Sequence, residues 1–313
     1  MRPQASRGSF LRLEHEILDQ PTLLSSFSRC DIGRAPSGSI LVGAGDSYLA
    51  ASIANRFGAM RYVVLDPYEL FSAPEIAKGR SVYFISISGK TVSNLAASRA
   101  VERFADQRVA VTANSNSELA RTMDSTIILP FKFVPRQPGI VSFTLSTVAL
   151  AKLAIDRFRC DFRSAISAAK VGSRDIRFTA RGTNHYLGNG ALYDVCRYAV
   201  LKSYELTGED SLATMLEEFG HSTVFGLKKG DVVNIFGEFD PADLSGRLRT
   251  LLEDRRYEAS TVRLRGTDTI QIVFSYIFAV QLAILRRGML TGLTRPYFVN
   301  AREMLSVSDS LIY

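Results

Sequence analysis

The segment Leu41-Val-Gly-Ala-Gly45 is a short apolar run that ends in a glycine turn, and a helix-length stretch from Tyr48 to Phe57 follows it. A similar segment, Tyr186-Leu-Gly-Asn-Gly190, precedes the helix-length stretch from Ala191 to Thr207. A strand, a glycine turn and a helix form the opening of a parallel α/β unit. Because this opening occurs twice in a chain of 313 residues, the sequence predicts two copies of one α/β unit.

Each opening leads into further apolar runs of strand length, which alternate with helix-length segments. The expected strands lie at 61–65, 81–87, 108–112 and 126–129 in the first half, and at 232–236 and 259–264 in the second. Short apolar strands that alternate with helices are typical of a parallel, doubly wound sheet with helices on both faces. The predicted fold class is therefore α/β, with two such domains in tandem.

The segments between these runs predict the domain organisation. Five regions are expected: an N-terminal helical arm over 1–30, a first domain over 31–160, a helical connector over 161–182, a second domain over 183–296 and a tail over 297–313. The arm is expected to be interrupted at Pro21, because proline removes a helical hydrogen bond. The most apolar run, 270–285, contains three polar residues and is too short for a membrane span, so we expect a buried core helix.

Composition excludes several classes of protein. The chain is 46% hydrophobic and 22% charged, as folded globular proteins are. Cys30, Cys160 and Cys196 form no CxxC pair, which argues against a disulfide framework and a zinc site and favours buried, reduced thiols in a cytoplasmic protein. The first seven residues contain no apolar core of a signal peptide. We expect no association with a membrane.

The net charge of +7 is spread along the chain, in clusters of no more than two basic residues. No aromatic ladder accompanies these clusters, so nucleic acid is not an expected partner. A dispersed basic surface does attract small phosphorylated anions. Charge therefore favours a small phosphorylated molecule as the partner.

The loop Ser86-Ile-Ser-Gly-Lys-Thr91 lies between an expected strand and an expected helix, where open α/β sheets bind their ligands. The hydroxyls of Ser86, Ser88 and Thr91 can donate to phosphate oxygens, and Gly89 allows the backbone to approach the ligand closely. A helix start also offers free N–H groups and a positive dipole end. Serine and threonine are equally common as helix caps, so spacing alone leaves both interpretations open.

A second candidate loop, Gly43-Ala-Gly45, is followed by Ser47 at the start of the next helix. Its glycines partly match the GxGxxG fingerprint of dinucleotide-binding proteins, but Tyr48 replaces the third glycine. An acidic residue, Asp66, stands near the end of the next strand. A nucleotide-linked oxidoreductase is therefore an alternative that the sequence leaves open.

Acid–base candidates lie in the second half of the chain. Lys202 and Glu205 are three residues apart on an expected helix and therefore share a face. Further on, Glu218 precedes His221, and histidine is a common acid–base group in proteins. The ordinary interpretations are a surface ion pair and a structural histidine.

The loop Ser86–Thr91 resembles the SQSGET loop of sugar-isomerase (SIS) domains, which holds a sugar phosphate in that family. Other segments follow in the order of the isomerase half of glucosamine-fructose-6-phosphate aminotransferase, so that the resemblance extends from about Leu13 onward: Leu13–Pro21, Val109–Asp124, Gly139-Ile-Val-Ser142 and Leu187–Glu205, the last matching LGRG…LKLKE. His221 follows Glu205 by sixteen residues, as the catalytic histidine follows the glutamate in that family. The resemblance implies two tandem SIS domains of flavodoxin-like topology.

The resemblance also implies roles for individual residues. Phosphate contacts are implied for the loop residues Gly45, Ser47, Ser86, Ser88, Gly89 and Thr91, with Ser142 at the sugar and Glu218 in the turn before the histidine. Glu205 would be the base that moves a proton between C1 and C2, His221 would assist ring opening, and Lys202 would position Glu205 or a substrate oxygen. No cofactor and no metal is expected. A homodimer is implied, in which the histidine comes from the neighbouring chain.

The sequence departs from the family at three points. Ile87 replaces the usual glutamine of the phosphate loop, no lysine follows Lys229 where the family tail carries one, and Arg2 stands where a glutaminase domain has cysteine. The missing lysine and cysteine favour deamination, deglycation or plain isomerisation over glutamine-dependent amination, with an amino-sugar phosphate such as glucosamine 6-phosphate or fructose 6-phosphate as the expected substrate, whereas Ile87 removes a polar phosphate contact. A fructosamine-phosphate deglycase and a phosphosugar sensor without turnover are the alternatives.

Overall fold

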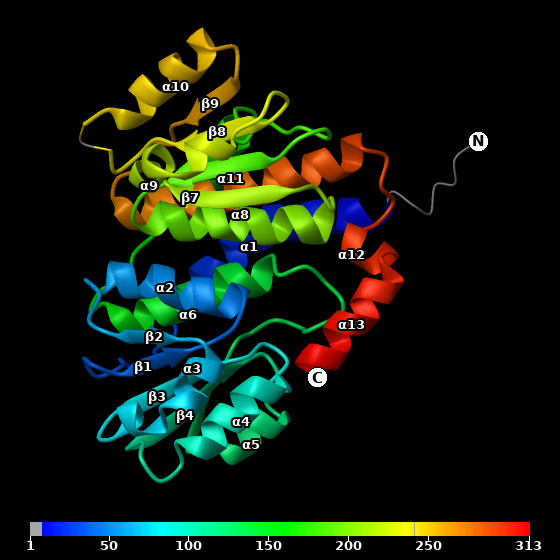
Figure 1. Cartoon of the computed structure of the whole chain (residues 1–313). Helices are drawn as coiled ribbons and strands as arrows, with labels where there is room; N and C mark the ends of the chain where they lie inside the picture. The colour runs from blue at the N-terminus through cyan, green and yellow to red at the C-terminus, as the bar shows by residue number, and fades with distance from the viewer. Residues whose placement is uncertain (1–7, 241) are drawn as a thin grey trace. The chain divides into compact units, whose positions relative to one another are not determined.

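The computed structural model describes residues 8–240 and 242–313, so the N-terminal stretch considered for a targeting signal lies outside it. The chain forms two compact units, each built around its own parallel sheet (Figure 1). The first unit comprises Leu23–Arg159 and Glu303–Tyr313. The second unit comprises Cys160–Arg302 and the described part of Met1–Thr22. The described part of the N-terminal segment therefore belongs to the second unit, and the C-terminal segment belongs to the first.

The first unit has a five-stranded sheet in the order β2-β1-β3-β4-β5, with every neighbouring pair parallel. Its strands are β1 Ile40–Val42, β2 Val63–Leu65, β3 Ser81–Ile85, β4 Gln107–Thr112 and β5 Ser125–Ile128. Its helices are α2 Asp46–Phe57, α3 Pro67–Ser72, α4 Val92–Ala100, α5 Glu118–Thr122, α6 Val141–Ala154 and α13 Arg302–Ile312, with a 3₁₀ turn at Pro74–Ala77. The strand order reverses direction between β1 and β3, which is the topological switch point of the sheet.

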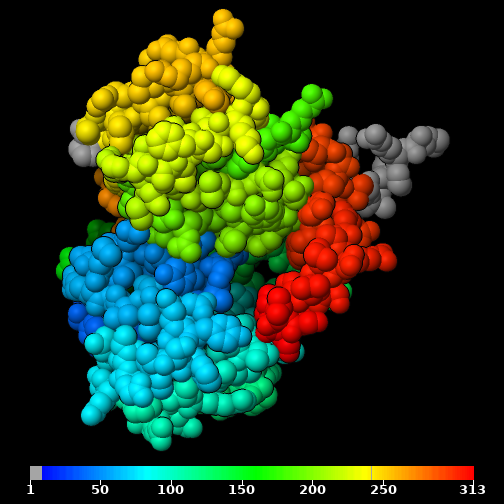
Figure 2. Space-filling model, in the orientation of Figure 1, coloured from blue at the N-terminus to red at the C-terminus, as the bar shows by residue number. Residues whose placement is uncertain are grey.

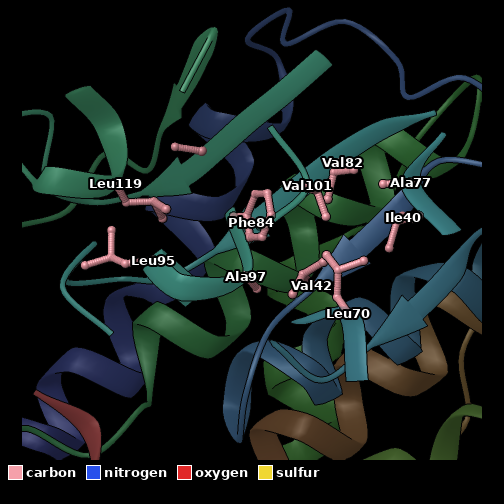
Figure 3. Packing of buried hydrophobic residues seen from close by; sticks show 11 residues of the cluster. Ile40, Val42, Leu70, Ala77, Val82, Phe84, Leu95, Ala97, Val101 and Leu119 are labelled. Atoms are coloured by element: carbon pink, nitrogen blue, oxygen red, sulfur yellow. The ribbon is translucent and has the colours of Figure 1, made fainter. Parts of the chain in front are cut away.

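A buried cluster joins one face of this sheet to α3 and α4. Phe84 of β3 lies beside Ala97 and Val101, while Val42 of β1 faces Leu70 (Figure 3). On the other side, α2 packs along α6. The alternation of buried strands and helices thus covers both faces of the sheet, as the sequence pattern predicted.

The second unit has a four-stranded parallel sheet in the order β7-β6-β8-β9. Its strands are β6 Asn184–Gly188, β7 Ser211–Met215, β8 Val232–Phe236 and β9 Glu258–Val262. Its helices are α7 Phe162–Gly172, α8 Ala191–Leu206, α9 Leu216–His221, α10 Leu244–Asp254, α11 Thr269–Leu290 and α12 Tyr297–Asn300, with a 3₁₀ turn at Thr223–Gly226. Because both units are parallel α/β sheets covered by helices, the predicted fold class is confirmed.

The helical arm differs from its prediction. Helix α1 runs without a break from Gly8 to Ser28 and contains Pro21. The predicted interruption is therefore wrong. Ile17 and Leu24, on either side of the proline, are fully buried, and this packing supports the helix although Pro21 donates no backbone hydrogen bond.

Helix α11 is longer than the apolar run that predicts it, and at 22 residues it has the length and composition to cross a membrane. The prediction that this segment is too short is therefore wrong. However, 72% of its most apolar window is buried inside the structure, where α7 and α8 pack against it. Such burial is typical of the core helix of a globular unit, and the prediction of a core helix is confirmed.

The cysteines are free, but only Cys196 is fully buried. Burial raises the pKa of the Cys196 thiol well above its usual range, which keeps it protonated and unreactive. Cys30 is exposed just beyond the end of α1, so the prediction that all three thiols are buried is wrong for this residue.

Candidate active site

Two loops of the first unit lie at the switch point of the sheet. The loop 43–46 follows β1, and the loop 86–91 follows β3, which pairs directly with β1. Parallel strands end at the same edge of a sheet, so these loops share the edge at which open α/β sheets bind ligands. The sequence therefore places its two glycine- and hydroxyl-rich loops where ligand binding is expected.

The hydroxyl loop is closely ordered. Ser86 and Ser88 are buried, and the Ser86 hydroxyl lies 3.0 Å from that of Thr91 and accepts a hydrogen bond from the Gly89 N–H at 3.1 Å. Thr91 immediately precedes α4, yet its side chain makes no capping bond to the helix. The interpretation of Thr91 as an ordinary helix cap is therefore wrong, and no hydrogen bond from the first N–H groups of α4 to a side chain is found within residues 8–240 and 242–313.

Gly89 is required by both conformation and space. Its φ is +63°, a left-handed conformation that favours glycine, and a Cβ at this position would collide with the Ser117 side chain. The loop is also held from behind, because Thr112 donates to the Ile87 carbonyl at 3.0 Å and the Leu119 N–H donates to the Gly89 carbonyl at 3.2 Å. Residues of β4 and the following turn thus fix the shape of the hydroxyl loop.

The first glycine loop is equally constrained. A Cβ on Gly43 would lie 2.8 Å from the Cβ of Ser47, and Gly45 has φ +54° directly before α2. Asp66, the residue that supported a dinucleotide site, instead caps α3, where it accepts the Tyr68 N–H at 2.8 Å within a capping box. Because this carboxylate is engaged in a cap, the oxidoreductase alternative loses its ribose-binding residue.

Ser142 lies half-buried in the first turn of α6, which packs along α2, the helix that carries Ser47. The residues implied at phosphate and sugar, Ser47, Ser142 and the hydroxyl loop, therefore all belong to the first unit.

The second unit contains a buried ion pair. Lys202 Nζ lies 2.6 Å from Glu205 Oε2 on α8; the lysine side chain is fully buried, whereas that of the glutamate is 31% exposed. The interpretation as a surface ion pair is therefore wrong. A buried ammonium is costly unless it is paired, so a gain in stability does not by itself explain this arrangement.

His221 and Glu218 lie on α9, and unlike Lys202 both are exposed. The His221 side chain is 76% exposed, and its Nε2 lies 3.4 Å from the equally exposed Glu217 carboxylate, one turn earlier. Glu218 is exposed as well. Within the described residues of a single chain, the contact found for His221 is thus with Glu217 and not with the Lys202–Glu205 pair.

Sequence reasoning missed several residues that shape these sites. Thr112 and Ser117 support the hydroxyl loop, while the Tyr198 ring lies against Lys202 and Gln281 donates to the Tyr198 hydroxyl. The available signal for Gln281 was its place as a polar residue in the most apolar run of the chain. Among residues 8–240 and 242–313, no group of three or more histidines, cysteines or carboxylates gathers to hold a metal ion.

Comparison with known proteins finds similarity at the level of structure. No protein-family profile and no curated protein sequence matches the chain. Among solved structures, glucosamine-6-phosphate deaminase from Thermotoga maritima has a TM-score of 0.71 at 18% identity, covering 90% of this chain and 95% of its own. The C-terminal domain of glucosamine-fructose-6-phosphate aminotransferase from Francisella tularensis has 0.70 at 16%, covering 90% and 96%. Tagatose-6-phosphate ketose/aldose isomerase from Escherichia coli has 0.64 at 18%, covering 93% and 92%. The chain thus has the double α/β fold shared by these phosphosugar enzymes.

Proposed function

We propose that the chain is a phosphosugar isomerase or amino-sugar-phosphate deaminase, which moves a proton between C1 and C2 of a sugar phosphate. The observation that carries the proposal is the Lys202–Glu205 pair, in which a fully buried ammonium lies 2.6 Å from a partly exposed carboxylate. The fold shared with phosphosugar isomerases and deaminases supports the same class of substrate.

The hydroxyl loop is the proposed phosphate anchor. Ser86, Ser88 and Thr91 offer donors at the uncapped start of α4, where the helix dipole favours an anion. Ser47 at the start of α2 and Ser142 at the start of α6 would contact the phosphate and the sugar. This arrangement anchors the substrate through groups that take no part in proton transfer.

Glu205 is the proposed base. Aldose–ketose exchange requires a carboxylate that removes the proton from C2 and returns it to C1, while the hydroxyl proton moves between the sugar oxygens. Lys202 would orient the Glu205 carboxylate, which its Nζ contacts, and would stabilise negative charge on a substrate oxygen. His221 would transfer the proton that opens the sugar ring.

The exposed position of His221 supports a homodimer in which this side chain serves the active site of the neighbouring chain. Sedimentation should therefore show a dimer at micromolar concentration. Mixing inactive Glu205→Gln with inactive His221→Ala chains should restore activity in part, because a mixed dimer holds one complete site. A fully active monomer would contradict this arrangement.

The proposed substrate is an amino-sugar phosphate such as glucosamine 6-phosphate, which deamination with one water converts into fructose 6-phosphate and ammonia, or fructose 6-phosphate itself for plain isomerisation. Arg295 and Arg302 stand near the end of the chain where the related aminotransferases carry a lysine, and arginine does not form Schiff bases. This difference favours isomerisation or deamination over amination. No cofactor is needed for this chemistry, and a cytoplasmic location stays a prediction from the cysteines.

A phosphosugar sensor is the second candidate, and Ile87 favours it because an apolar side chain replaces a polar one in the anchor loop. A panel of sugar phosphates, incubated in deuterated water, tests both candidates. An enzyme should wash deuterium into C2 of at least one sugar, with ammonia release if it is a deaminase. Binding of a sugar phosphate without any deuterium exchange would contradict the isomerase or deaminase proposal and would support the sensor. A fructosamine-phosphate deglycase would instead release a free amine from C1.

A further inference from the structure

A chain of buried polar groups leads from α1 to Lys202. Gln20 donates from Nε2 to Gln281 Oε1 at 2.9 Å, and Gln281 donates from Nε2 to the Tyr198 hydroxyl at 3.1 Å. The Tyr198 ring lies 5.3 Å from Lys202 Nζ. Gln20 is 1% exposed and the other side chains are fully buried, so these contacts form inside the second unit.

The members of this chain come from three helices but end on one face of α8. Tyr198, Lys202 and Glu205 occupy positions i, i+4 and i+7, which form a single stripe along a helix. The ring of Tyr198 offers its π-face to an ammonium that is removed from water, where this attraction is strongest. Because Gln281 on α11 donates to the hydroxyl of this ring, it restrains the ring that lies against Lys202.

Stability alone does not account for the arrangement. Among the described residues, Oε1 of Gln20 has no hydrogen-bond partner although it is buried. A buried acceptor without a partner is destabilising, and so is each polar group placed in an apolar core. Leucines at positions 20 and 281 together would fill the core without the two buried amides, so the polar chain is consistent with a role at its far end.

We infer that Gln20, Gln281 and Tyr198 are positioning residues, which hold the Lys202 ammonium against Glu205. The inference rests on the proposed function only for its effect on catalysis, in which Glu205 is the base. The position of Lys202 can be measured without turnover. The N-terminal helix thereby contributes to the reacting pair through two amides and a phenol.

The test compares Tyr198→Phe, which keeps the ring and loses its hydroxyl, with Gln281→Leu. The protection of Lys202 is measured by acylation with acetic anhydride and peptide mass spectrometry, with the exposed Lys170 of α7 as internal reference. Loss of one buried hydrogen bond should raise the relative modification of Lys202 about fivefold. Where the wild type catalyses deuterium exchange, kcat should fall by a similar factor and shift in its pH profile, while KM stays unchanged.

The matched control is Gln271→Leu, which removes another buried amide from α11 without touching the chain to Lys202. It should leave the modification of Lys202 and the pH profile as they are in the wild type. Unchanged Lys202 protection in both test variants, or an equal change in Gln271→Leu, would overturn the inference. If the Gln281→Leu variant does not fold, the modification of Lys202 in the Tyr198→Phe variant alone tests the inference. Altered protection in a protein without exchange activity would sustain the positioning and reject the enzyme.

Discussion

The loop after β3 and the loop after β8 occupy the same place in two sheets of matching strand order, but the helix starts beside them differ. β3 pairs with β1 in the first unit, as β8 pairs with β6 in the second. In the first unit α4 begins without a side-chain cap. In the second, Asp240 accepts hydrogen bonds from the N–H groups of Leu244 at 2.9 Å and Ser245 at 2.6 Å, at the start of α10.

In such a repeated fold, a helix start can bind an external anion only where no side chain of the protein already accepts hydrogen bonds from its N–H groups. Burial raises the pKa of Asp240, but hydrogen bonds from Ser245 and Leu244 outweigh it, so the pKa lies below its usual value. The second unit therefore supplies its own anion at this place. We expect the first unit to bind the phosphate, and the second to react through Glu205.

The variant with the largest expected effect tests the role proposed for Glu205 in the second unit. Glu205→Gln keeps the shape of the side chain but cannot accept the C2 proton, so deuterium exchange should fall about a hundred- to ten-thousandfold. Sugar-phosphate affinity, measured by calorimetry, should stay near that of the wild type because the anchor lies in the first unit. Exchange that persists in this variant would remove Glu205 from the role of base.

The binding side is tested by Ser86→Ala combined with Thr91→Ala. Each hydrogen bond to a charged group is worth roughly 1.5–3 kcal/mol, so the double variant should bind sugar phosphate about a hundred- to ten-thousandfold more weakly. Ser98→Ala is the control, since its buried hydroxyl bonds to the Leu95 carbonyl within α4 and lies outside the loop. Equal affinity of the double variant and the control would refute the anchor.

A smaller effect is expected from Ile87→Gln. This change adds the amide found in the SIS loop that this loop resembles, and one hydrogen bond to a charged phosphate is worth roughly 1.5–3 kcal/mol. Affinity for sugar phosphate should rise by a factor of about ten to a hundred, which a fluorescence or calorimetric titration resolves. A loss of affinity would show that the apolar side chain contributes to ligand binding, and would sharpen the difference from the related enzymes.

The smallest effect concerns the filled helix start. Asp240→Ala should destabilise the second unit by about 1 kcal/mol at pH 7, as loss of a helix cap does. Because the folded pKa of Asp240 lies below 3.8, its contribution is present above that pH and is lost as the pH falls through the folded value. The difference in unfolding free energy between the two proteins should therefore be full at pH 7 and should shrink as the pH falls below 3.8, which denaturant unfolding over a pH series measures. A difference that stays constant across the series would contradict the ionic origin of the cap.

The strands and glycine loops could be predicted from sequence because local pattern determines them. Continuous apolar runs such as 81–85 mark buried parallel strands, and glycine at 45 and 89 marks backbone that only glycine adopts freely. Strand β7 was missed, because Ser211–Met215 lies at the sheet edge and alternates between buried and exposed residues. Its short mixed sequence carries no strand signal comparable to those of the inner strands.

The surroundings of the Lys202–Glu205 pair could not be predicted, because they depend on contacts between segments that are distant in the sequence. Spacing gave Lys202 and Glu205 a shared face, but only the packing of α11 against α8 shows that the lysine is buried. Likewise Pro21 predicted a break that the burial of its neighbours overrides. The roles of Glu205, His221 and the loop residues stay predictions until the experiments above are made.

The bond between Gln20 and Gln281 joins residues 261 positions apart, and this separation governs the order of events during synthesis. Chains emerge from the ribosome beginning at the N-terminus, and early segments generally fold before later ones arrive. The N-terminal helix, however, has to wait for α11 before its Gln20 finds a partner, and closing so large a loop is slow and entropically unfavourable. The contacts that lead from Gln20 to the Tyr198 ring beside Lys202 are therefore completed only after α11 has been made, so a chain that stops before α11 lacks part of the surroundings of the Lys202–Glu205 pair.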